Sequence, residues 1–169
     1  MSDATLQYYL IALGSNRRHR DYGNPRNVIA LAVQTLRSHD LRVIRQSKTI
    51  TTNPIGPSIR NYANGAVLIS TALDPTSLLL LLKKIERQHG TRRGQRWSAR
   101  VLDLDIIWWS EGIWTSTNPP LSVPHLAFRE RDFVLRPCAE IAPSIVDPIS
   151  GLTMAQLFHR QNRRKPLDL

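Results

Sequence analysis

The segment Val101–Trp109 most constrains the fold, because it is rich in Val, Ile, Leu and Trp yet contains two aspartates. Such a run predicts a β-strand. Side chains alternate between the faces of a strand, so Asp103 and Asp105 share one face, about 7 Å apart, while Leu102 and Leu104 point into a core. Two carboxylates on one face repel each other, and a bound cation offsets that cost. Oxygen ligands favour a hard ion, so the pair predicts Mg²⁺ with water and phosphate oxygens completing its shell.

The segment before this strand has the opposite charge. Between Lys83 and Arg100 the lysines and arginines greatly outnumber the acids, of which Glu86 is the only one. Gly90 and Gly94 interrupt any helix there. Guanidinium groups bind some phosphate oxygens through paired hydrogen bonds, while a metal ion binds others. The combination predicts phosphoryl chemistry. A solvated arginine loop beside a solvated sheet face would also explain the same residues.

At these residues the chain resembles a known family. The run R-W-S-A-R-V-L-D-L-D-I-I, residues 96–107, is similar to the signature of the hydroxymethyldihydropterin pyrophosphokinases of folate biosynthesis. In that family an Arg-Trp pair, a small residue or Pro, and a second Arg precede L-D-L-D. The resemblance extends from about Tyr8 to Leu157. It implies transfer of the βγ-pyrophosphoryl group of ATP to the 6-hydroxymethyl group of a reduced pterin, with release of AMP.

The order of the expected elements is strand, helix, strand, strand, helix, strand. This order is typical of the α+β ferredoxin-like fold, an antiparallel sheet with two helices on one face. The resemblance implies the same βαββαβ core with C-terminal additions. The hydrophobic pattern predicts strands over Leu6–Leu13, Leu41–Thr51, Asn61–Thr71 and Val101–Trp109, and helices from Pro25 to about Ser38 and from Pro75 to about His89.

Shorter elements are expected after the fourth strand. They are a hairpin over Glu111–Pro120, a short helix over Phe128–Phe133, a turn over Pro137–Ile141 and a last helix over Thr153–His159. We expect a single pyrophosphokinase domain over residues 1–160, followed by a basic tail over residues 161–169.

The resemblance implies a pterin pocket. A pterin is a flat ring edged with hydrogen-bond donors and acceptors, so its pocket needs aromatic faces and amide groups. Tyr62 and Phe133 match the family's stacking residues; without the resemblance both would be expected in the core. The residues implied for this pocket are Thr52, Asn53, Ile55, Tyr62, Asn64 and Phe133.

The resemblance also implies a site for ATP and magnesium. Asp103 and Asp105 would hold two Mg²⁺ ions between the phosphates and the attacking hydroxyl. Arg100, with Arg92 or Arg93, would neutralise charge that develops during transfer. The residues implied for ATP binding are Glu86, Arg96, Trp97, His125 and Arg131. Simpler explanations remain open, including an exposed helix residue for Glu86 and a structural histidine for His125.

Two positions depart from the family pattern. The family usually has an arginine directly after the glycine that ends the second helix, where this chain has Thr91. An aromatic residue often follows the histidine of V-P-H, where this chain has Leu126. Both positions are ones where a change would affect the affinity for the nucleotide and the turnover rate rather than the existence of the site. They leave open a catalytically weak relative that binds pterin or nucleotide as a sensor.

The net charge of +10 suits a polyanionic partner. RNA-recognition domains share the ferredoxin-like order, but their R-G-F-x-F-type strand motif is absent, so nucleic acid is not the expected partner. The single cysteine, Cys138, excludes an intrachain disulfide. The chain has neither a signal-peptide layout nor an apolar run long enough for a bilayer. We therefore expect a cytoplasmic monomer that acts on ATP and hydroxymethyldihydropterin.

Overall fold

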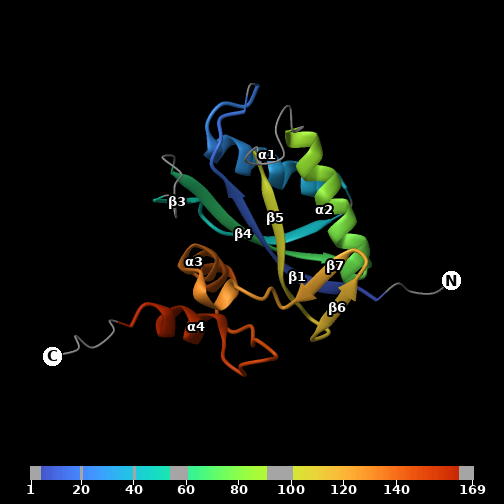
Figure 1. Ribbon diagram of the computed structural model, residues 1–169, viewed down its shortest axis with the longest axis vertical. Helices are drawn as coiled ribbons and strands as arrows, with labels where there is room; N and C mark the ends of the chain where they lie inside the picture. Colours follow the sequence, from blue (N-terminus) through green and yellow to red (C-terminus); the bar gives the residue numbers. More distant parts are fainter. Residues whose placement is uncertain (1–4, 20, 40, 54–60, 91–100, 164–169) are drawn as a thin grey trace.

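A five-stranded antiparallel sheet forms the centre of the molecule (Figure 1). The computed structural model describes residues 5–19, 21–39, 41–53, 61–90 and 101–163. Its strands are β1 (Gln7–Ser15), β2 (Arg42–Gln46), β3 (Ile50–Thr52), β4 (Tyr62–Thr71) and β5 (Asp103–Trp109). The strand order is β2-β4-β1-β5, with β3 also paired to β4, and every pairing is antiparallel. The predicted ferredoxin-like βαββαβ core is confirmed.

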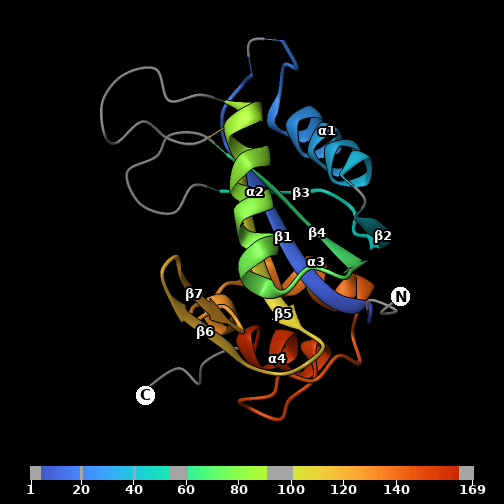
Figure 2. The same cartoon turned by 90° about the vertical axis from the view of Figure 1, so that its right-hand side faces the viewer.

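Two helices, α1 (Pro25–Ser38) and α2 (Pro75–His89), cover one face of the sheet (Figure 2). Each begins with a proline preceded by a capping side chain. Asn24 accepts a hydrogen bond from the backbone N–H of Asn27, and Asp74 accepts from those of Thr76 and Ser77. Such caps satisfy backbone donors that a helix leaves unpaired at its start.

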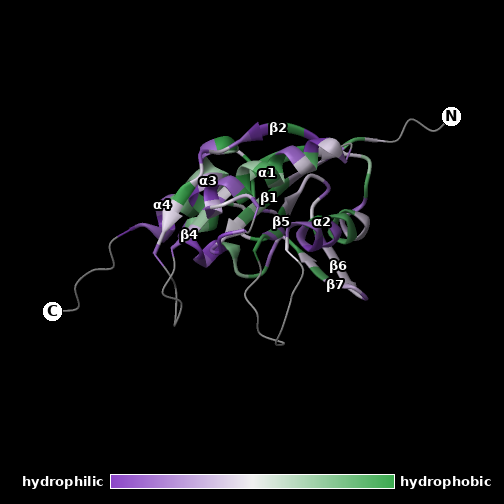
Figure 3. Ribbon diagram, turned by 90° about the horizontal axis from the view of Figure 1, so that it is seen from above, coloured by the Kyte–Doolittle hydropathy of each residue, from purple (hydrophilic) through white to green (hydrophobic). Residues whose placement is uncertain are grey.

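The C-terminal elements cover the opposite face of the sheet (Figure 1). They are the 3₁₀ turn η1 (Phe128–Glu130) and the helices α3 (Asp132–Ile141) and α4 (Met154–Gln161). Leu10 and Ile107 of the sheet pack there against Phe128 and Leu135. Because both faces are covered, the sheet is the middle of three layers, with one hydrophobic cluster on each side. At one edge, β2 is mostly exposed and hydrophilic (Figure 3), which discourages pairing with another chain.

A small hairpin connects β5 to the C-terminal layer. Its strands are β6 (Trp114–Thr117) and β7 (Pro120–Val123). A hairpin was expected here over Glu111–Pro120, and its second strand extends beyond those bounds. Trp114 donates from Nε1 to the hydroxyl of Thr76 at 3.1 Å and contacts Trp109 edge to face. These contacts fix the hairpin against the start of α2. None of the helices in the described ranges combines the length and apolar character needed to cross a membrane.

Three expectations about the elements were wrong. The strand expected over Leu41–Thr51 is divided into β2 and β3, because Ser47 turns inward and its hydroxyl accepts from the N–H of Ala66. The helix expected over Phe128–Phe133 is instead η1, followed by the start of α3. The turn expected at Pro137–Ile141 lies within α3. There Pro137 is buried and α3 packs against β4, so tertiary packing outweighs the poor helix propensity of proline.

Candidate active-site cleft

A cleft of about 710 Å³ lies where one end of the sheet meets η1 and α3. The sheet forms its floor, and the chain from Ala127 to Val134 forms a wall. The described residues that line it are Ala12, Leu13, Gly14, Thr52, Asn53, Tyr62, Asn64, Asp103, Asp105, Ala127, Glu130, Arg131, Asp132, Phe133, Val134 and Gln161.

The pairing register of the strands determines which side chains lie next to one another on the floor of the cleft. Gly14 of the central strand β1 pairs with Asn64 on one side and with Asp103 on the other. Two residues earlier, Ala12 pairs with Asp105. A glycine and an alanine on the cleft face leave open space between an amide and two carboxylates. A Cβ atom at Gly14 would meet Asn64 Oδ1 at 3.5 Å, an ordinary contact that would narrow this space.

The two aspartates line the cleft from one face of β5, as predicted. Both are partly buried, whereas Leu104 between them is fully buried on the opposite face. The alternation expected of a strand therefore brings the carboxylates together. Among the described residues, no group of three or more His, Cys, Asp or Glu that could hold a metal is found.

Glu86 of α2 lies behind β5. Its carboxylate accepts a hydrogen bond from the backbone N–H of Leu104 at 2.7 Å and another from Lys83 Nζ at 2.8 Å. Only 8% of Glu86 is exposed, and it is not among the described residues that line the cleft. In this position it contacts the strand between the two aspartates.

Tyr62 and Phe133 both line the cleft, from β4 and α3. Asn64 is 5% exposed, and its Nδ2 donates to the hydroxyl of Thr52 at 2.8 Å, which fixes the orientation of the amide. Arg26 of α1 supports the same edge, because it donates to Thr49 O and to the hydroxyl of Thr51. Thr52 and Asn53 line the cleft as well. Ile55 lies outside the described residues.

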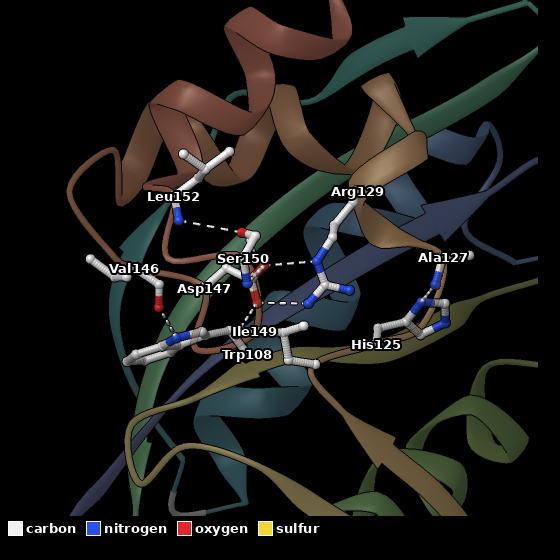
Figure 4. Close-up of polar contacts among 9 residues, drawn as sticks. All are labelled: Trp108, His125, Ala127, Arg129, Val146, Asp147, Ile149, Ser150 and Leu152. Carbon is white, nitrogen blue, oxygen red and sulfur yellow. Dashed lines mark hydrogen bonds and ion pairs between the residues drawn. The ribbon is translucent and has the colours of Figure 1, made fainter.

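Arg131 lines the cleft from the C-terminal layer, whereas His125, six residues earlier, is not among the described residues that line it. The Nδ1 atom of His125 accepts from the N–H of Ala127 at 3.2 Å (Figure 4), so the neutral ring has its proton on Nε2. Burial lowers the pKa of His125, the Asp105 carboxylate opposes the shift, and the Arg131 guanidinium adds to it. The ring therefore lies within electrostatic reach of both residues. Arg131 also lies 6.0 Å from the centre of the Phe133 ring.

Several lining residues were missed in the sequence. Glu130 and Asp132 flank Arg131, and Gln161 comes from the end of α4, where its Nε2 donates to the carbonyl of Glu130 at 3.0 Å. Gln161 was expected to begin the tail, and no sequence pattern marks its contact across 31 positions. The remaining predicted site residues, Arg92, Arg93, Arg96, Trp97 and Arg100, lie outside the described residues.

Comparison with known proteins supports the resemblance. Residues 10–143 match the model of the 7,8-dihydro-6-hydroxymethylpterin-pyrophosphokinase (HPPK) family. Three relatives are each named 2-amino-4-hydroxy-6-hydroxymethyldihydropteridine pyrophosphokinase. The Methylorubrum extorquens protein is 38% identical over 148 residues, which cover 86% of this chain and 88% of the relative. The Pseudomonas aeruginosa protein is 35% identical over 142 residues, 83% of each chain. The Synechocystis protein is 38% identical over 120 residues, 71% of this chain and 60% of the relative.

The fold is also similar to that of a solved structure. The crystal structure of Plasmodium falciparum HPPK-DHPS with pteroate superimposes with a TM-score of 0.70 at 14% identity. The match covers 92% of this chain but only 42% of the Plasmodium chain, and at this identity it concerns the fold alone. The family match and the bacterial relatives extend over most of the sequence, and the chain therefore belongs to the 7,8-dihydro-6-hydroxymethylpterin-pyrophosphokinase family.

Proposed function

We propose that the cleft binds a hydroxymethyldihydropterin beside the phosphates of ATP, and that pyrophosphate transfer takes place between them. Membership of the family makes the chain a pyrophosphokinase that acts on hydroxymethyldihydropterin in folate biosynthesis. The observation that supports this location is the register around Gly14, which separates Asn64 from Asp103 by one strand. An amide suited to a heterocycle thus lies beside carboxylates suited to a metal phosphate.

The pterin would occupy the end of the cleft near β3 and β4. Tyr62 and Phe133 present aromatic rings there, and stacking on such rings favours a flat heterocycle. The hydrogen bond to Thr52 uses one Nδ2 proton of Asn64, so the second proton and Oδ1 can serve the ring edge. Backbone groups of Thr52 and Asn53, together with Ile55, would complete the pocket.

Asp103 and Asp105 would be the protein ligands of Mg²⁺. Carboxylates from one short stretch, with space left for water and phosphate, suit an ion that seldom occupies an all-protein cage. A bound Mg²⁺ would withdraw charge from the phosphates and lower the pKa of the attacking hydroxyl. Other acids in the cleft, Glu130 and Asp132, lie on the opposite wall and are not part of this proposed pair.

Arg131 and His125 would contact the phosphates. The guanidinium stays charged at every relevant pH and can form two parallel hydrogen bonds to a phosphate. The lowered pKa of His125 keeps its ring neutral near pH 7, where Nε2 can donate a hydrogen bond. Arg100, with Arg92 or Arg93, is proposed to neutralise charge that develops during transfer, and Arg96 and Trp97 are proposed to bind ATP. Glu86 is proposed to assist ATP binding through the position of β5.

The rate would come from alignment and electrostatic stabilisation. Phosphoryl transfer requires little covalent chemistry from the protein, and it needs the hydroxyl and the leaving phosphate in line. The floor would hold both groups through Asn64 and the two aspartates, and the wall would contact them through Phe133 and Arg131. The monomeric state and cytoplasmic location remain predictions from the sequence.

Product analysis tests the proposal. Purified protein is incubated with ATP, Mg²⁺ and 6-hydroxymethyl-7,8-dihydropterin, and the nucleotides and pterins are separated. We expect equal amounts of AMP and pterin diphosphate, and no AMP when pterin is omitted or EDTA is added. ADP as the product, or AMP without pterin, would overturn the assignment. Binding of both substrates without AMP would instead favour the sensor function.

A further inference from the structure

Asp147 is a fully buried carboxylate outside the cleft. It lies in the connection between α3 and α4, and 0% of it is exposed. Arg129 of η1 donates to it twice, from Nε at 2.7 Å and from Nη2 at 2.6 Å (Figure 4). A guanidinium and a carboxylate joined by two parallel bonds have a defined mutual orientation. The pair therefore holds Arg129 in one position.

The loop around Asp147 is also stabilised by hydrogen bonds to the same carboxylate. The N–H groups of Ile149 and Ser150 donate to it, as does the Ser150 hydroxyl (Figure 4). Burial alone would raise the pKa of Asp147, but the hydrogen bonds from Arg129 and Ser150 lower it to about 2. The carboxylate therefore stays charged, and Arg129 is held by a folded turn rather than by a mobile surface side chain.

Arg129 belongs to the wall of the cleft but points away from it. Ala127 before it and the run Glu130–Val134 after it line the cleft, whereas Arg129 and Phe128 do not. The Arg129 guanidinium lies 4.6 Å from the centre of the Phe128 ring, which is fully buried beneath it. The ion pair with Asp147 thus fixes the wall from behind.

The proposed phosphate ligands are joined to this turn through the backbone. The N–H of Phe128 donates to His125 O at 3.4 Å, and the N–H of Arg131 donates to Phe128 O at 3.2 Å. The carbonyl of Arg131 then accepts from Val134 and Leu135 at the start of α3. Arg129 lies within this bonded segment, so a change in its position would be passed to Arg131, whereas His125 is also held to β5 because its N–H donates to Ile107 O at 3.1 Å.

We propose that Asp147 and Arg129 are positioning residues for phosphate binding. Through their ion pair they orient the segment 125–131, so that His125 and Arg131 face the phosphates beside Asp103 and Asp105. The pair contacts neither substrate and acts through the residues that do. This inference rests on the proposed function of the cleft.

A second contact of the same loop offers a matched control. Trp108 of β5 donates from Nε1 to Val146 O at 2.9 Å (Figure 4). This bond attaches the loop to the sheet and does not touch η1. Trp108→Phe should therefore loosen the loop without releasing Arg129, whereas Asp147→Asn removes the charge that orients Arg129.

Steady-state kinetics with ATP, Mg²⁺ and pterin test the inference. For Asp147→Asn we expect kcat/KM for ATP to fall about tenfold, because a small misplacement of phosphate ligands is costly. The dissociation constant of pterin alone should stay within about twofold, because Tyr62 and Asn64 lie on the sheet and Phe133 belongs to α3, outside the segment 125–131. Trp108→Phe should lower Tm but leave both constants near those of the wild type.

Coupling between the two residues gives a second readout. If Asp147 acts through Arg129, the double variant Asp147→Asn/Arg129→Gln should be no slower than the slower single variant. Arg129→Lys should reduce kcat/KM for ATP in the same direction, because lysine keeps the charge but not the paired hydrogen bonds. Should Asp147→Asn fail to fold, Arg129→Lys and Trp108→Phe still make the comparison.

The outcomes distinguish a failure of the proposed function from a failure of the positioning role. An inactive wild type would contradict the proposed function itself. An active wild type with unchanged ATP kinetics in Asp147→Asn and Arg129→Lys would overturn the positioning role alone. Equal losses of ATP kinetics in Trp108→Phe and Asp147→Asn would also overturn it, because the loop would then act only through general stability.

Discussion

The carboxylate of Glu86 accepts a hydrogen bond from the N–H of Leu104, the residue between Asp103 and Asp105. β5 has a strand neighbour only on its β1 side within the described sheet. The N–H of Leu104 is buried on the other side, where α2 provides the acceptor. A side chain from a helix thus takes the place of a missing strand at the point where the metal ligands are proposed.

Removing this acceptor should destabilise the strand. For Glu86→Ala we expect the free energy of unfolding to fall by roughly 1–3 kcal/mol, the cost of leaving a buried N–H unpaired. Glu86→Gln keeps an acceptor oxygen and should lose less. Urea denaturation of the three proteins measures the difference. Equal stability of Glu86→Ala and the wild type would show that water or another group replaces the carboxylate.

Neutralising either proposed metal ligand should abolish turnover. Asp103→Asn and Asp105→Asn keep the size of the side chain but lose the charge that attracts Mg²⁺. We expect no measurable AMP formation from either variant, with circular dichroism and Tm close to those of the wild type. Glu111→Gln, an exposed acid beyond the end of β5, is the matched control and should retain activity. Normal activity and unchanged Mg²⁺ binding in both aspartate variants would refute the assignment.

Truncating the aromatic residues of the cleft should weaken pterin binding. Tyr62→Ala and Phe133→Ala should each cost roughly 1–3 kcal/mol of binding free energy, the range for a lost stacking ring. Tyr62→Phe keeps the ring and should bind nearly as well as the wild type. Tyr8→Ala removes a partly exposed tyrosine from the other end of β1 and serves as a control. Calorimetry that found unchanged affinity in both truncations would place the pterin elsewhere.

The strand and helix order was predictable because it depends on local periodicity. Alternation between polar and apolar residues placed Asp103 and Asp105 on one face and Leu104 on the other, and the structure confirms this. The antiparallel order of the sheet followed from the sequence of elements. These features depend on neighbours within a few positions in the chain.

The contacts that could not be predicted join distant positions. Pro137 is buried in a helix that packs against β4, and Ser47 interrupts a strand because its hydroxyl accepts from the N–H of Ala66. Asp147 is separated from Arg129 by 18 positions, and no periodic pattern relates them. Each of these three features depends on tertiary packing, which cannot be predicted from local sequence propensity.

The pKa of His125 should depend on the charged side chains of Asp105 and Arg131. Its pKa should lie below the value of about 6.5 for a free histidine, because burial disfavours the protonated ring. Asp105→Asn should lower this pKa further, because the Asp105 carboxylate favours the protonated form, and Arg131→Ala should raise it. The ring Cε1 proton followed by NMR measures all three values. A pKa above 6.5 in the wild type would contradict the described environment of the ring.

The same shift should affect stability in a defined pH window. The pKa of His125 is lower in the folded protein, so the unfolded chain binds more protons as pH falls below about 6.5. The contribution of His125 to the free energy of unfolding is thus fully present above that pH. It declines as pH falls toward the folded pKa and is constant below it. His125→Asn should remove this part of the slope, so wild type and variant should differ most in pH dependence between the folded pKa and about 6.5. Urea denaturation at several pH values measures both profiles, and parallel profiles would show that the ring is equally easy to protonate in both states.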